Sequence, residues 1–243
     1  MMYSIYKKEI RSFLSSLIAY VVMLVFLLAI GLFTWVLPDY NVFDNGYANL
    51  DTLFSMAPWL FIFLISAITM RSLSEEKRNG TIEIITTKPI TDLQIILGKY
   101  FAGLTLVLFT LLPTLIYYIT IYQLGSPIGN IDSGAIWGSY IGLFFLSACF
   151  VAIGMFASAI SDNQIVSFVV SMFLCFLFYN LFELIADFKL LGSWDAAVAG
   201  LGINAHYQSI SRGVIDSRDL IYFIGFDVVF ITATKTIFGA RKW

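Results

Sequence analysis

The sequence predicts an all-α membrane protein with six transmembrane helices, and its composition and hydropathy pattern lead to this prediction. Of the 243 residues, 59% are hydrophobic and only 12% are charged, whereas soluble domains carry roughly 25% charged residues. The mean hydropathy is +0.86. The apolar residues gather in runs long enough to cross a bilayer, which takes about 20 residues of helix. We expect spans at residues 17–37, 52–70, 100–122, 134–160, 165–186 and 220–238.

The segment before the first span, residues 3–16, has the pattern of an amphipathic interfacial helix on the membrane surface. Apolar side chains such as Tyr6, Ile10 and Phe13 recur at helical spacing, and the basic residues lie largely off that face. Such a helix suits an anionic membrane surface; a plain extension of the first span is the alternative. The apolar run at 17–37 is longer than the core of a signal peptide, so we expect a retained span.

Lys and Arg residues are distributed unevenly among the polar segments. Three precede the first span, five lie within residues 71–99 and three follow from Lys235, so these segments hold eleven of the 14. The remaining three are Lys189, Arg212 and Arg218 in the other links. The positive-inside rule therefore predicts that both termini and residues 71–99 are cytoplasmic. An even number of spans agrees with this topology.

Residues 71–99 form the one long polar link that is rich in Lys and Arg. The dipeptide Asn79-Gly80 predicts a break after a charged helical turn. Thr91 and Gln94 have the spacing of a capping box, in which two side chains satisfy the first backbone N–H groups of a helix. We expect a short, rigid cytoplasmic element between these two signals. An ordinary solvated loop is the alternative.

Two local signals predict irregularities within or between the spans. Pro113 lies inside the third span, where a missing backbone N–H predicts a kink. Ser161 and Gln164 have capping-box spacing and predict the start of the fifth span.

The long, glycine-interrupted link at 187–219 contains apolar segments too short to cross a bilayer. We expect re-entrant or interfacial helices there, on the outside.

The fourth span begins with a glycine stripe. Its members are Gly134, Gly138 and Gly142, four residues apart. Small residues at this spacing let the backbone of another helix approach closely. The stripe therefore predicts either helix packing within the bundle or a subunit contact.

The sequence offers no catalytic set. The single histidine, His206, lies in the outside link with no second His or Cys near it in sequence, so we expect a solvated or interface histidine. No GxxxxGK[ST] phosphate-binding loop is present. Cys149 and Cys175 lie inside apolar runs and are expected to act as small hydrophobic residues. We therefore expect no enzymatic activity, cofactor or metal in this chain, and the net charge of −2 does not favour nucleic acid.

Asp227 is the one carboxylate well inside a span, and Glu183 lies near the outer end of the fifth span. A charge at such depth is costly, so the side chain should face the protein interior and have a partner. The two residues form a possible intramembrane polar site for a substrate or proton. The alternative is a structural role for a neutral or hydrogen-bonded Asp227.

The polar link after the second span resembles the cytoplasmic loop of ABC-2 type transporter permeases. The matching residues are Glu75-Glu76-Lys77-Arg78-Asn79-Gly80-Thr81-Ile82-Glu83, Thr87-Lys88-Pro89-Ile90 and Gly98-Lys99, and a second match is Ser209-Ile210-Ser211-Arg212-Gly213-Val214-Ile215-Asp216. With six spans, the resemblance covers the whole chain, residues 1–243, as a single ABC-2 type transmembrane domain. Within the family, the chain is most similar to gliding-motility-associated permease subunits.

The resemblance implies a coupling helix within residues 71–99 that docks into a cytosolic ABC ATPase, which would bind ATP and Mg. The implied contact residues are Glu75, Glu76, Gly80, Thr81, Ile82, Glu83 and Pro89. It also implies a bacterial inner-membrane location and a second permease subunit, as a homodimer or with a related membrane protein. In gliding-type systems an accessory protein with a large extracytoplasmic domain is a further partner.

Two functions fit the sequence. The first is the permease subunit of an ATP-driven transporter, with export as the family tendency. The second is a non-transporting membrane scaffold or anchor for a motility or secretion machine. An intramembrane enzyme is disfavoured because His206 stands alone outside the spans.

Overall fold

The computed structural model describes residues 2–44, 46–82, 89–189 and 192–240. The chain is 80% helical, and no strand occurs in the described residues. Six helices in this part of the chain are long and apolar enough to cross a membrane: Leu17–Trp35, Asp51–Arg78, Asp92–Leu124, Ser133–Ile160, Gln164–Asp187 and Ser217–Gly239. The predicted helical class and the six candidate spans are confirmed.

The elements follow one another as α1 (Met2–Ser15), α2 (Leu17–Trp35), α3 (Asp51–Thr69), α4 (Ser74–Arg78), α6 (Asp92–Leu111), η1 (Leu112–Thr114), α7 (Leu115–Leu124), α8 (Ser133–Ile160), α9 (Gln164–Phe176), η2 (Leu177–Leu181), α10 (Phe182–Asp187), η3 (Gly192–Trp194), α11 (Asp195–Ala199), α12 (Ile203–Ser211) and α13 (Ser217–Gly239). Of the short η elements, η1 and η3 are 3₁₀ turns and η2 is a π-helical turn.

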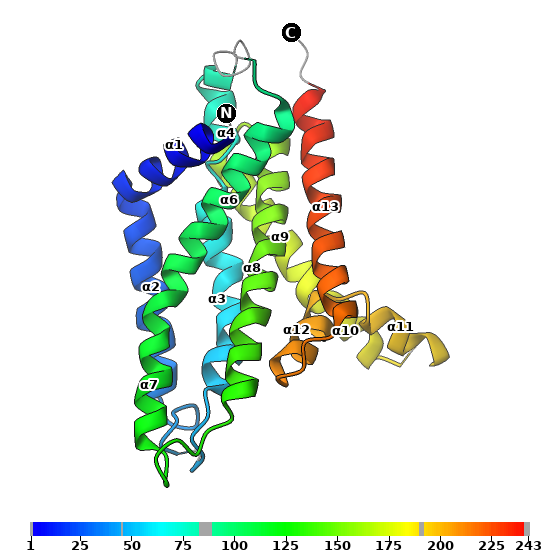
Figure 1. Cartoon of the computed structure of the whole chain (residues 1–243). Helices are drawn as coiled ribbons and strands as arrows, with labels where there is room; N and C mark the ends of the chain where they lie inside the picture. The colour runs from blue at the N-terminus through cyan, green and yellow to red at the C-terminus, as the bar shows by residue number, and fades with distance from the viewer. Residues whose placement is uncertain (1, 45, 83–88, 190–191, 241–243) are drawn as a thin grey trace.

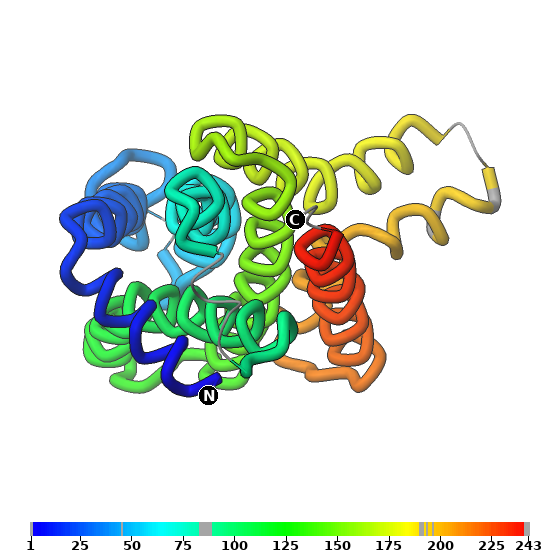
Figure 2. The backbone as a smooth tube through the Cα atoms, turned by 90° about the horizontal axis from the view of Figure 1, so that it is seen from above, coloured from blue at the N-terminus to red at the C-terminus, as the bar shows by residue number. Residues whose placement is uncertain are grey.

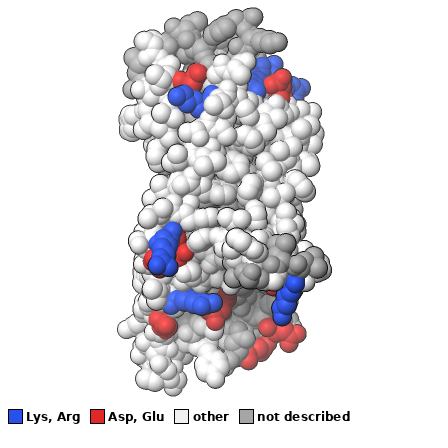
Figure 3. Space-filling model, turned by 90° about the vertical axis from the view of Figure 1, so that its right-hand side faces the viewer, with Lys and Arg blue, Asp and Glu red and all other residues white. Residues whose placement is uncertain are grey.

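Both termini lie at the same end of the bundle, and α4 lies there too (Figure 1). We call this the terminal end, and we call the end with links 36–50 and 125–132 the opposite end. On the face shown in Figure 3, charged side chains gather in two bands that are separated by an uncharged belt. This distribution fits a body that crosses a bilayer, because charged groups avoid the hydrocarbon layer.

Helix α8 is the centre of the bundle (Figure 2). Of its apolar segment, 78% of the residues are buried, against 22% in α2, α9–α10 and α13. A Cβ atom on Gly154 would collide with Thr69 of α3 and lie 2.7 Å from its Cβ. Glycine at this position therefore lets the Thr69 side chain of α3 pack directly against the backbone of α8.

The predicted helix irregularities have mixed outcomes. Pro113 lies in the 3₁₀ turn η1, which interrupts the regular helix between α6 and α7 at the position of the predicted kink. The capping box at Ser161 and Gln164 is wrong. Asn163 is the N-cap instead, and its Oδ1 accepts a hydrogen bond of 2.9 Å from the Ile165 amide. Asn caps as well as Ser does, and it stands nearer the helix start.

The link between the fifth and sixth candidate spans leaves the bundle and returns. Helices α10 and α11 project away from the other helices (Figure 2), and α12 returns to pack on α8. A Cβ on Gly138 would lie 2.8 Å from the Ile210 carbonyl oxygen, and one on Gly142 would lie 3.2 Å from the Tyr207 ring. These two glycines therefore pack against α12 within the chain. A Cβ on Gly134 would meet only Asp132 of the preceding turn.

His206 of α12 contacts the start of α13, as expected for an interface histidine. Its Nδ1 lies 2.7 Å from Asp219 Oδ1, and its Nε2 lies 2.9 Å from the Gly200 carbonyl oxygen. Its ring stacks on Tyr222 with centroids 3.8 Å apart. These contacts join α12, the link before it and the start of α13.

Gly138→Ala should destabilise the protein by about 1–3 kcal/mol, the usual cost of overpacking a tight contact. The added methyl would meet the Ile210 carbonyl oxygen and the Gly213 backbone, at 2.8 and 2.9 Å, and neither can rotate away. Gly225→Ala in α13 is the matched control, because nothing lies within 4 Å of its Cβ position. Thermal unfolding in detergent should show a lower Tm for the first variant only. Equal Tm values would contradict the packing described here.

Candidate functional site around helix α4

Helix α4 is a short helix at the terminal end, separated from α3 by a turn at residues 70–73 (Figure 1). Its sequence, Ser-Glu-Glu-Lys-Arg, has two acidic residues in the first turn and two basic residues in the last. This charge order matches the helix dipole. Yet five residues are too few for a helix that is stable alone. Contacts with other helices must therefore hold it in place.

The first such contact is with Ser158 near the end of α8. The Ser158 Oγ accepts hydrogen bonds from the backbone amides of Leu73 (2.9 Å) and Ser74 (3.1 Å). The same hydroxyl donates to the Met70 carbonyl oxygen at 3.2 Å. No side chain within α4 caps its N-terminus, so a fully buried serine of another helix performs that function.

Lys77 makes a second contact with the same end of α8. Its Nζ donates a short hydrogen bond to the Ala159 carbonyl oxygen and lies 3.8 Å from Asp162 Oδ1. A lysine near a helix C-terminus satisfies a free carbonyl and interacts favourably with the helix dipole. Helix α4 is thus attached to α8 at both of its ends.

The third contact is an ion-pair cluster of Lys8, Glu9, Glu76 and Lys99, which we call the charge cluster. Lys99 Nζ of α6 lies 2.9 Å from Glu9 Oε1 of α1 and 3.0 Å from Glu76 Oε1 of α4. Lys8 Nζ lies 2.8 Å from the same Glu76 oxygen and 3.5 Å from Glu9. Two cations and two carboxylates alternate, so each charge has opposite neighbours. Three helices meet at this point.

Burial makes these charges strongly dependent on one another. Lys99 is 3% exposed, Glu9 8% and Glu76 9%. Removing one partner from a buried ion pair leaves an uncompensated charge, which costs more than the pair gains. Burial alone would lower the pKa of the Lys8 ammonium, but the Glu76 and Glu9 carboxylates outweigh it and raise this pKa above its ordinary value.

Close packing of α1 on α6 brings the charge cluster together. A Cβ on Gly98 would lie 3.1 Å from the Ile5 side chain and 3.2 Å from the Met2 carbonyl oxygen. The neighbouring residue, Lys99, therefore reaches Glu9 without crossing solvent. Tyr6 and Thr105 add a hydrogen bond of 3.1 Å between the same two helices.

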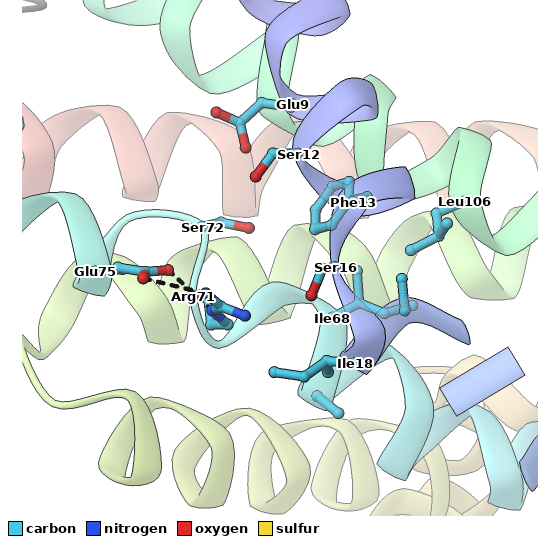
Figure 4. A pocket seen from close by; sticks show the side chains of 12 residues that line it. Glu9, Ser12, Phe13, Ser16, Ile18, Ile68, Arg71, Ser72, Glu75 and Leu106 are labelled. Carbon is cyan, nitrogen blue, oxygen red and sulfur yellow. Dashed lines mark hydrogen bonds and ion pairs between the residues drawn. The ribbon is translucent and has the colours of Figure 1, made fainter. Parts of the chain in front are cut away.

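A small polar cavity lies beside the charge cluster, between the α1–α2 corner and the α3–α4 turn (Figure 4). Its volume is about 70 Å³. Arg71 donates two hydrogen bonds to the Glu75 carboxylate across it, at 2.9 and 3.1 Å. Ser12 and Glu9 of α1 face the same space (Figure 4). The α1–α2 corner and the α3–α4 turn thus face each other across a hollow with mixed polar and apolar walls.

The residues predicted to contact an ATPase fall into two groups. Gly80 and Thr81 are exposed just after α4, Pro89 is exposed, and Glu75 is partly exposed in its pair with Arg71. Glu76 and Ile82 are buried, the first within the charge cluster. Glu83 lies outside the described residues. That these residues contact an ATPase stays a prediction.

The two carboxylates of the predicted intramembrane polar site have separate partners. Asp227 Oδ2 accepts a hydrogen bond of 2.9 Å from the Tyr100 hydroxyl, and its Oδ1 is buried without a partner in the described part of the chain. Glu183 accepts a short hydrogen bond from Asn204 Nδ2. The possible substrate or proton role of these residues stays a prediction. No group of three or more His, Cys, Asp or Glu residues that could hold a metal occurs in the described ranges.

Sequence reasoning missed two residues on which this site depends, Glu9 and Ser158. Glu9 is the only acidic residue among the first 38, and a single acid within a basic helix was a usable signal for an internal partner. Ser158 lies among small residues of an apolar helix and carried no such signal.

Lys99→Met should destabilise the protein by roughly 3–5 kcal/mol, because Glu9 and Glu76 would then share only Lys8. Lys7→Met is the matched control: it removes the same charge from an exposed position of α1, where a change of less than about 0.5 kcal/mol is usual. Chemical unfolding in detergent measures both. Equal midpoints would mean that the charge cluster adds nothing to stability.

No curated protein matches the chain at a significant level. Residues 36–188 match the family described as ABC-2 family transporter protein, and this region includes α4, its partners on α6 and α8, and the link between α3 and α6. The match covers more than half of the chain. The protein therefore belongs to the ABC-2 transporter family and is a membrane transport domain rather than a catalytic one.

Proposed function

We propose that the chain is the membrane-spanning permease subunit of an ABC transporter, driven by a separate cytosolic ATPase that docks on α4 and the segment up to Pro89. One observation carries this proposal: α4 is fixed to three other helices, to α8 through Ser158 and Lys77 and to α1 and α6 through the charge cluster. A contact that transmits force must be held rigidly by its neighbours. A solvated loop would bend under the same force.

The proposed coupling contact divides its residues by role. The exposed residues at and after the end of α4, including Arg78, Gly80 and Thr81, would face the ATPase. Glu76 and Ile82 are buried and would hold that surface in position. ATP and Mg would be bound by the partner and not by this chain.

The proposed orientation places the terminal end in the cytoplasm and the chain in a bacterial inner membrane. The eleven Lys and Arg residues counted for that side support it. In the same proposal α1 is an interfacial helix. Leu14 is 44% exposed and Leu17 77%, so apolar side chains at the α1–α2 corner remain free to contact lipid.

The proposed assembly pairs this chain with a second permease subunit, as a homodimer or with a related membrane protein. Export is the proposed direction, and a gliding-motility system with an accessory extracytoplasmic protein is the proposed context. The sequence resemblance of residues 75–90 and 209–216 supports this narrower assignment.

Gly80→Ala should reduce the stimulation of ATPase activity in a reconstituted complex while the chain stays in the membrane. Gly80 has φ +67°, which strains a residue with a Cβ and should change the course of the exposed segment after α4. Gly46→Ala is the matched control, because Gly46 has φ +68°, equally open surroundings and a position at the opposite end. Both variants carry the same backbone strain. Equal stimulation in the two would contradict docking at this segment.

Asp227→Asn separates a permease from a membrane scaffold. The Asn side chain keeps an acceptor for the Tyr100 hydroxyl but cannot carry a charge or release a proton. A permease whose buried carboxylate takes part in the transport cycle should bind the ATPase normally and stimulate it less. Unchanged binding and unchanged stimulation would favour the scaffold.

A further inference from the structure

A groove at the opposite end lies between α3, the π-helical turn η2, α8 and α12. Its volume is about 380 Å³, within the range of about 300–1,000 Å³ that small-molecule sites occupy. The charge cluster and the coupling segment lie at the other end of the bundle, so the groove belongs to neither. Packing of the bundle does not require an open space here.

Aromatic side chains from three elements line the groove. Phe54 and Trp59 come from α3, Tyr179 from η2 and Tyr207 from α12. Trp59 is 40% exposed, and its ring meets Tyr179 edge-on with centroids 5.6 Å apart. The faces of such rings carry partial negative charge and attract cations, with Trp the strongest.

The charged residue that lines the groove is acidic. Asp51 is the one ionisable Asp, Glu, Lys or Arg among the described lining residues, and it is exposed. An adjoining hollow of about 230 Å³ shares Asp51 and adds Asp132, again with no Lys or Arg in its described lining. Asn204, which lines the groove, donates to Glu183 just behind it. Carboxylates without balancing cations favour a positively charged occupant over an anion.

Tyr179 supplies an independent sign of a binding site. Its side chain is 5% exposed and lines the groove. Its hydroxyl makes no hydrogen bond with the described part of the chain and is not among the buried atoms that lack a partner, so it opens to the groove. Tyr179 also lies in the π-helical turn Leu177–Leu181, and such turns occur frequently at functional sites. The ring and hydroxyl of Tyr179 are therefore open to a molecule bound in the groove.

We propose that this groove binds an organic cation with aromatic or other apolar groups. Trp59 and Tyr179 would contact the cation and its apolar groups, and Asp51 would select the charge. That the bound cation is cargo of the transporter rests on the proposed permease function; the binding site itself does not.

The test uses the full chain in detergent and two probes of equal shape, tetraphenylphosphonium and tetraphenylborate, in isothermal titration calorimetry. The cation should bind saturably with one site per chain, and the anion should not. Trp59→Ala should weaken cation binding roughly tenfold, the effect of losing a desolvated cation–π contact. Asp51→Asn should reduce the preference for the cation. Trp194→Ala is the matched control, because Trp194 is 70% exposed outside the groove.

Several results would overturn the proposal: equal affinity for the two probes, cation binding that is unaffected by Trp59→Ala and Asp51→Asn, or saturable binding of a neutral sugar such as maltose but not of the cation. Circular dichroism and gel filtration of each variant show whether the fold is kept. Asp51→Asn, at an exposed position, is the second variant if Trp59→Ala does not fold. ATPase stimulation in the reconstituted complex without probe tests the permease function separately. Stimulation without cation binding defeats the groove proposal alone, and binding without stimulation defeats the permease proposal alone.

Discussion

The salt bridge from Lys99 to Glu9 and Glu76 is the interaction on which the terminal end of this protein depends. Its three residues come from α6, α1 and α4, helices that the sequence separates by up to 90 residues. In a low-dielectric site each of these charges is stable only while the others are in place. The ion pairs therefore specify one arrangement of the three helices, because a shifted helix would leave a buried charge alone. Apolar packing at this point would allow sliding, and paired charges do not.

Helix α8 extends this constraint through the bundle. At the terminal end its Ser158 and Ala159 hold α4, and in its middle Gly154 lets α3 touch it. At the opposite end α12 packs against Gly138 and Gly142, and its residue Tyr207 lines the groove. One buried helix thus contacts both the proposed docking element and the proposed binding groove. A displacement of α4 has a continuous path of packed side chains along α8 to the groove.

Much of the fold was predictable from the sequence because its determinants are local. Hydropathy gave the six candidate spans, Thr91 and Gln94 form the predicted capping box, and Gly80 breaks the chain after α4 as expected. The rest depends on contacts between distant residues. The cap on α4 comes from Ser158, some 84 residues away. The ion pair of Glu9 with Lys99 depends on the packing of α1 against α6. The π-helical turn Leu177–Leu181 contains no proline or glycine from which it could have been predicted. The error at Ser161 arose because two good capping residues stand close together, and spacing alone did not choose between them.

The burial of Glu76 changes how the docking segment should be understood. A family resemblance marks residues 75–83 as one contact surface, but a carboxylate that is 9% exposed and pairs with two lysines has little left to offer a partner. Arg78, two residues further on, is exposed, and the backbone has a positive φ at Gly80 just beyond it. Such a motif would then have two separate roles. Its exposed residues would form the surface that a partner contacts, and its buried charge would keep this surface attached to the bundle. In the proposed complex, loss of either would weaken coupling to the ATPase, but only loss of the buried charge would also destabilise the packing of α1. Stability measured beside ATPase stimulation therefore separates a residue that the partner touches from one that anchors the contact.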